Sequence, residues 1–181
     1  MTTRYGDSFV MSGFRGLAAI IILLATVSGG AQDLTQAHRE QHTRCRSLQE
    51  EGRWQEAREV ALELVSEFSD APPSQHKLVF TNELANLNQR LGNYIEAEAG
   101  YGSSLALASV VTGPETVLVS QLKNNLAALY QVLGRFEVAE TLNREALAIR
   151  EKVDGKGAAA TVPAMNNLAG LLWCIGDLDG A

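Results

Sequence analysis

One six-residue phrase returns four times in this 181-residue chain, and the repetition constrains the fold more than any other feature. Each copy starts with Gly, has a large apolar residue two positions later and, five positions later, Ala. The copies span 52–57, 92–97, 134–139 and 176–181, so their starts are 40, 42 and 42 residues apart. Repeats of this length indicate a solenoid, in which each unit buries its apolar face only against its neighbours.

Apolar residues three and four positions apart precede each of the last three copies, and this is the spacing of a helix. These stretches cover 84–91, 126–133 and 168–175. A Gly directly after the last apolar residue ends a helix in the left-handed conformation and lets the chain reverse. The pattern therefore predicts tight turns at Gly52, Gly92, Gly134 and Gly176, each followed by a second helix.

The second helices are expected at about 94–111 and 136–153, and the first hairpin at about 37–51 and 54–68. Ala57, Ala97 and Ala139 lie early in second helices, where they can face small residues of the preceding helix. Aromatic residues make up only 6% of the chain, which suits helices packed through small side chains. We predict seven helices in antiparallel pairs, forming an all-α, right-handed superhelical solenoid over residues 38–181. Its units fall at about 38–73, 74–115, 116–157 and, truncated, 158–181.

The third unit carries the motif Leu122-x-Asn124-Asn125-Leu126-Ala127-x-Leu129-Tyr130, followed by Gly134. With this motif the chain resembles the tetratricopeptide repeat superfamily, and its 42-residue period is similar to that of kinesin light chains. The second unit departs from the motif at Asn88 and Ser104, and the first has Arg44 and Cys45 in place of Leu and Ala. The resemblance implies a scaffold whose first helices line a concave groove that grips a peptide.

Asparagine recurs in register on the predicted first helices, although it is a mediocre helix former. One hypothesis is that these amides donate to and accept from the backbone of a bound peptide. The other is that they hydrogen-bond neighbouring helices, or persist from duplication. The groove candidates are Asn82, Asn124, Asn125, Asn166, Asn167, Gln121 and Gln131, with Asn86, Gln89 and Arg90 as weaker ones.

Residues 1–31 have the composition of an export signal. Arg4 and Arg15 precede an apolar run at 17–27, and small residues follow up to Ala31. The run is shorter than the roughly 20 residues that span a bilayer. We therefore expect a secreted or periplasmic protein with a short linker at 32–37 and no stable membrane insertion after the signal is removed. A retained N-terminal anchor is the alternative.

The sequence offers little for catalysis. His38, His42 and Cys45 could place three metal ligands on one helix face, but no fourth ligand or general base accompanies them. Gly155 and Gly157 match a loose dinucleotide pattern, yet a helix precedes them instead of a strand. No nucleophile and base occur in a known arrangement. We expect no enzyme activity, no metal and no cofactor.

The net charge of the chain bears on which class of partner it can bind. The net charge is −6, and no segment concentrates Lys and Arg, which argues against nucleic acid. We also expect Cys45 and Cys174 to stay unpaired, because they fall in the first and fourth units. The predicted function is an exported, non-catalytic scaffold for a protein or peptide partner.

The sequence stops at Ala181, where the second helix of the fourth unit should start. Leu168, Leu171 and Leu172 would then lack a covering helix. Two hypotheses follow: the chain is the N-terminal piece of a longer protein, or this face mediates self-association. The alternative function is accordingly a regulatory or sensory arm of an enzyme or signalling protein whose active domain lies beyond residue 181.

Overall fold

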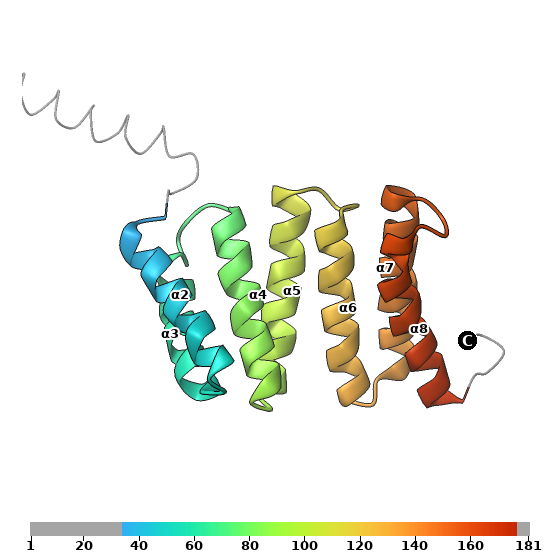
Figure 1. Cartoon of the computed structure of the whole chain (residues 1–181), viewed down its shortest axis with the longest axis horizontal. Helices are drawn as coiled ribbons and strands as arrows, with labels where there is room; N and C mark the ends of the chain where they lie inside the picture. The colour runs from blue at the N-terminus through green and yellow to red at the C-terminus, as the bar shows by residue number, and fades with distance from the viewer. Residues whose placement is uncertain (1–33, 177–181) are drawn as a thin grey trace, which may run out of the picture. The chain divides into compact units, whose positions relative to one another are not determined.

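The computed structural model describes residues 34–176, and this part of the chain is helical without any strand. Its helices are α2 (Gln36–Glu50), α3 (Trp54–Glu67), α4 (Gln75–Arg90), α5 (Tyr94–Val111), α6 (Val117–Val132), α7 (Phe136–Asp154) and α8 (Val162–Ile175), with a 3-10 helix at Ala159–Thr161. Figure 1 shows α4 to α8 following one another in chain order after the α2–α3 pair. The all-α repeat fold is therefore confirmed.

Two predictions fall outside the described residues. The expected export signal at 1–31 is one, and the end of the fourth phrase, from residue 177 onward, is the other. The side chain of Cys174 is not described either. Within 34–176, no helix combines the length and the apolar character that crossing a membrane requires.

Each hairpin turn is built on a glycine with positive φ. The values are 75° at Gly52, 80° at Gly92 and 70° at Gly134. At the end of α4, the Gly92 N–H donates to the carbonyl of Gln89 at 3.2 Å, and the next N–H donates to Asn88 at 2.8 Å. The same two bonds close α2 and α6. This pattern satisfies carbonyls that the helix end would leave without partners, so each first helix stops at its glycine.

The first helices begin at side-chain caps. The hydroxyls of Thr35, Ser74 and Thr116 each accept a hydrogen bond from the backbone N–H three residues ahead. Such caps satisfy N–H groups of the first turn, which have no carbonyl partner inside the helix. In α8, Pro163 lies in the first turn, where its missing N–H costs nothing.

Small side chains hold each hairpin together, and leucines join neighbouring hairpins. Ala85 of α4 and Ala97 of α5 are fully buried in one cluster, which Leu129 of α6 enters from the next repeat. In the same way, Ala127 of α6 and Ala139 of α7 share a cluster with Leu171 of α8. No hairpin covers its own apolar face, so the core continues from unit to unit.

The first unit keeps this small contact despite its departure from the motif. Cys45 takes the position that Ala85 has in the second unit, and it is fully buried. Its thiol donates to the carbonyl of Ala57 at 3.4 Å. Cysteine here serves as a slightly larger alanine.

A close approach on α5 was not foreseen from the sequence. A Cβ placed on Gly100 would lie 2.8 Å from the Cβ of Ala85 on α4. Glycine in a helix reads as a weak point, because it lowers helix propensity. Here it lets α4 and α5 approach each other at a point where even a methyl group does not fit.

Candidate functional site

Three recesses follow one another along α2, α4, α6 and α8, the first helices of the repeats. The first and second recesses share Gln49 and Asn86, and the second and third share Asn125 and Ala128. Neighbouring recesses that share lining residues adjoin one another, and we call this row of three recesses the groove.

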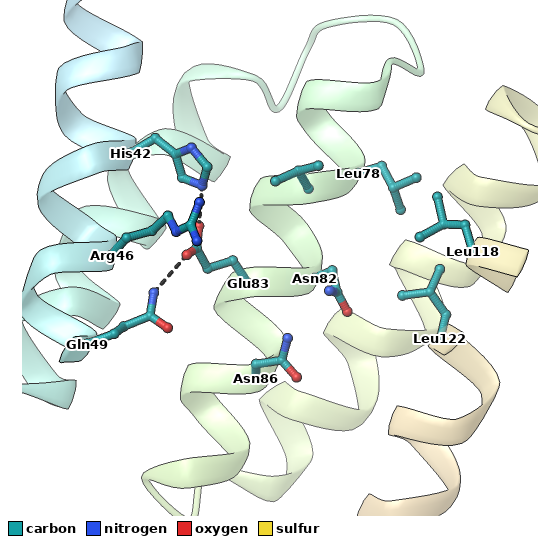
Figure 2. A pocket seen from close by; sticks show the side chains of 10 residues that line it. His42, Arg46, Gln49, Leu78, Asn82, Glu83, Asn86, Leu118 and Leu122 are labelled. Carbon is teal, nitrogen blue, oxygen red and sulfur yellow. Dashed lines mark hydrogen bonds and ion pairs between the residues drawn. The ribbon is translucent and has the colours of Figure 1, made fainter. Parts of the chain in front are cut away.

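The first recess has a volume of about 310 Å³ and lies between α2, α4 and α6 (Figure 2). Its lining residues are His42, Arg46 and Gln49 of α2, Leu78, Val79, Asn82, Glu83 and Asn86 of α4, and Leu118 and Leu122 of α6. Figure 2 shows the leucines of α6 across the recess from the α2 side chains, with the two asparagines of α4 between them. This end of the groove therefore combines charged, amide and aliphatic groups.

Glu83 ties α2 to α4 within the first recess. Gln49 Nε2 donates to Glu83 Oε1 at 2.7 Å, and His42 Nε2 lies 3.0 Å from Oε2. Both contacts are drawn in Figure 2. By the 42-residue period, Glu83 occupies the position of Asn125 and Asn167 in later repeats. A carboxylate in this unit thus bonds across to the first helix of the previous repeat.

The arrangement of three metal ligands on α2 does not form. His38 Nε2 contacts Glu67 Oε2 at 2.8 Å, while His42 pairs with Glu83. Burial, followed by the charge of Glu83, raises the pKa of the Cys45 thiol to about 11, so the thiol stays protonated at neutral pH. Over residues 34–176, no group of three or more His, Cys, Asp and Glu side chains is placed to hold a metal ion.

The second recess has a volume of about 520 Å³ and is dominated by Tyr101. It is lined by Gln49, Asn86, Gln89, Arg90, Tyr94, Tyr101, Asn125, Ala128 and Val132. The buried Tyr101 hydroxyl lies 2.6 Å from Asn86 Oδ1 and 2.7 Å from Gln89 Oε1. Burial raises its pKa to about 12. The hydroxyl has one proton, so it donates to one of these two weaker groove candidates at a time.

Arg90, another of the weaker groove candidates, lies next to an aromatic ring. The Arg90 guanidinium carbon lies 4.7 Å from the centre of a Trp54 ring, within the range of a cation–π contact. This contact keeps the cation of the second recess next to α3. Arg90 is also one of the residues that line the second recess.

The third recess has a volume of about 480 Å³ and is lined mainly by amides, and none of its lining residues within the described chain is charged. Its lining residues are Asn124, Asn125, Ala128 and Gln131 of α6, Asn143 of α7, and Asn166, Asn167, Gly170 and Leu171 of α8. The Asn143 side chain is 1% exposed, and its Nδ2 donates to the Asn167 carbonyl at 3.5 Å. Its Oδ1 has no hydrogen-bond partner among the described residues.

Six of the seven groove candidates line the groove. Asn82 is in the first recess, and Asn124, Asn125, Gln131, Asn166 and Asn167 are in the third. Gln121 lies one helical turn before Asn125, exposed and outside the three linings. The Oδ1 atoms of Asn82 and Asn124 are buried without a partner in the described part of the chain. The hydrogen bonds to neighbouring helices that a structural role requires are therefore not found for these two oxygens.

Asn143 is not among the predicted groove residues, because it lies on a second helix and the recurring asparagines lie on first helices. A signal for it existed in the sequence. Asn143 lies 42 residues after Tyr101 and interrupts the apolar face of α7 between Ala139 and Ala146, both fully buried. A polar residue at a core position of a helix is the sign that could have marked it.

One family model matches the C-terminal part of the chain. Residues 118–181 match the family model of the tetratricopeptide repeat. The crystal structure of BtubC (BKLC) from P. vanneervenii is 28% identical, with a TM-score of 0.65 over 76% of this chain and 55% of that one. The chain thus spans little more than half of that protein.

A second structure supports the same fold. It is described as a Podosopora anserina kinesin light chain with nearly identical TPR-like repeats. It is 24% identical, with a TM-score of 0.68 over 78% of this chain and 68% of that one. No curated protein matches the chain in sequence.

Proposed function

We propose that this chain holds an extended segment of a protein partner in its groove. Its helices form tetratricopeptide repeats similar to those of kinesin light chains, and such repeats indicate a protein–protein interaction scaffold. The groove is the row of three recesses along α2, α4, α6 and α8. Repeats of this family are in general non-catalytic, so the proposed activity is binding.

The main support for the proposal is that two side-chain amide oxygens, at equivalent positions of successive repeats, lack hydrogen-bond partners among the described residues. Asn82 and Asn124 occupy the same position on α4 and α6, and the Oδ1 of each is buried without a partner among the described residues. A buried acceptor left unpaired costs about 1–3 kcal/mol. An extended peptide offers backbone N–H groups at regular intervals along a groove. Binding such a segment would satisfy both oxygens without requiring a particular side chain.

The test is binding of peptides to the full chain. A library of random peptides should yield binders, and Asn124→Ala should lower their affinity by up to about tenfold, as expected for the loss of one hydrogen bond. Asn166→Ala should act in the same direction. Ser103→Ala, an exposed change on α5, is the matched control. Binding unaffected by both asparagine changes, with melting temperatures equal to that of the control, would count against the groove.

We further propose that the protein acts outside the cytoplasm, on the basis of the charged and apolar pattern of residues 1–31. Expression of the full sequence in an exporting host should give a mature product that begins at Gln32. N-terminal sequencing of the product measures this directly. An uncleaved chain that remains with the cytoplasmic fraction would contradict the proposal.

A further inference from the structure

The second and third recesses are built from the same positions of successive repeats. Tyr101 on α5 and Asn143 on α7 are 42 residues apart, as are Gln89 and Gln131. In the second recess, the Tyr101 hydroxyl is within hydrogen-bond distance of two amide oxygens of α4. The second recess therefore contains an example, internal to the chain, of an amide oxygen that accepts a hydrogen bond from the side chain at this position.

The third recess has no such internal donor. Asn143 replaces the tyrosine, Ala128 takes the position of Asn86, and Gly170 takes that of Ala128. All three side chains are smaller than their counterparts. The residue at the tyrosine position contributes an additional acceptor instead of a hydroxyl.

One neighbour favours a single orientation of the Asn143 amide. Nδ2 lies 3.5 Å from the backbone carbonyl of Asn167, so exchanging the two ends of the amide would bring two oxygens together. Oδ1 is therefore the atom without a partner in the described chain, on a side chain that is 1% exposed. Asn124, which lines the same recess, presents a second buried oxygen of this kind.

We propose that the third recess is a subsite for the primary amide side chain, glutamine or asparagine, of the bound segment. Its two N–H donors equal in number the two unpaired oxygens of Asn124 and Asn143, and its carbonyl can accept from the Nδ2 groups of Asn125, Asn166 or Asn167. Among residues 34–176, no charged side chain lines the recess, so a lysine, arginine or carboxylate would enter it without a counter-ion from this part of the chain. This specificity rests on the proposed groove function.

The test uses three small probes of similar shape with the full chain. N-acetylglutamine N-methylamide should bind about tenfold more tightly than N-acetylmethionine N-methylamide, because only the glutamine probe carries a primary amide, whose two N–H groups can serve the buried oxygens. N-acetylglutamate N-methylamide, which is charged, should bind no better than the methionine probe. Titrations followed by NMR should shift the side-chain amide signals of Asn143 and Asn167. Equal affinity for the glutamine and methionine probes would reject the subsite.

Three variants assign the preference to Asn143. Asn143→Leu removes the acceptor at similar volume and should abolish the glutamine preference, which Ser103→Ala on the exposed face of α5 should leave intact. Asn143→Tyr supplies the hydroxyl that the second recess already has and should exclude the glutamine probe. If the leucine variant does not fold, the tyrosine variant decides. A preference that survives in a folded variant overturns the proposal.

The outcomes for the groove and for the subsite can be separated. Library peptides that bind through Asn124 and Asn166 without enrichment of glutamine or asparagine would uphold the groove function and reject the subsite. A glutamine probe that binds selectively, while no library peptide binds, would uphold the subsite and reject the groove function.

Discussion

Two glycines on α5 differ in what a single methyl group would meet. A Cβ on Gly100 would lie 2.8 Å from Ala85 Cβ, whereas a Cβ on Gly102 meets nothing within 4 Å. Neither Gly100 nor Gly102 needs positive φ, since both lie inside a helix. The first glycine is required by packing, and the second only lowers helix propensity.

We predict opposite effects for alanine at these two positions. Gly100→Ala should destabilise the chain, because overpacking costs about 1–3 kcal/mol and outweighs a gain of at most about 1 kcal/mol in helix propensity. Gly102→Ala should stabilise it by about 0.5–1 kcal/mol. Urea unfolding of the two variants measures the difference. Equal stabilities would mean that α4 and α5 can separate without cost.

The raised pKa of the Cys45 thiol predicts that the stability of the chain depends on pH. Its pKa is raised from 9.0 to about 11 in the folded chain, mainly by burial. The unfolded chain therefore loses this proton first, and its contribution to stability is present below pH 9 and falls as the pH rises toward 11. The free energy of unfolding should drop more steeply over this interval in the native chain than in Cys45→Ala. Parallel curves would contradict the shift.

At the scale of elements, the four repeated segments that begin with glycine predict the helix bounds best. They predicted α5 at 94–111, as observed, and α7 within one residue of its observed end. A glycine with positive φ, followed by a helix start, is a local property, so sequence periodicity can reveal it. Contacts between helices that are far apart in sequence are not local. The approach of Gly100 to Ala85 and the bond from Tyr101 to Asn86 were both missed for that reason.

The candidate site was predictable in its repeated part only. Asn124 and Asn166 recur in register and were placed on the groove helices in advance. Asn143 belongs to a second helix and differs from its counterpart Tyr101, so a search for recurrence could not find it. Residues that break a repeat need a comparison between units, position by position, before their role can be inferred.

At the scale of the whole described chain, the core is shared between repeats. Leu171 of α8 is fully buried against Ala127 of α6 and Ala139 of α7. Leu87 of α4 is likewise fully buried with Cys45 and Ala57 of the first hairpin. Each hairpin thus depends on the next one for part of its apolar cover.

We predict that Leu87→Ala destabilises the first hairpin as well as its own. The loss should be about 2–5 kcal/mol, since the change removes buried methyl groups and leaves a cavity between α2, α3 and α4. Hydrogen exchange should show faster exchange of α2 and α3 amides in this variant. Leu62→Ala, at an exposed position of α3, is the control. Faster exchange confined to α4 and α5 would show that the repeats are independent.

The groove differs in charge from one end to the other. His42, Arg46 and Glu83 line the first recess, whereas the described residues that line the third are amides and small or aliphatic groups. A peptide bound as proposed along α2 to α8 would therefore meet two unlike ends of the groove. If its charged residues lie near one terminus, reversing its residue order would place them against the amides, so binding of this kind would depend on the direction of the peptide.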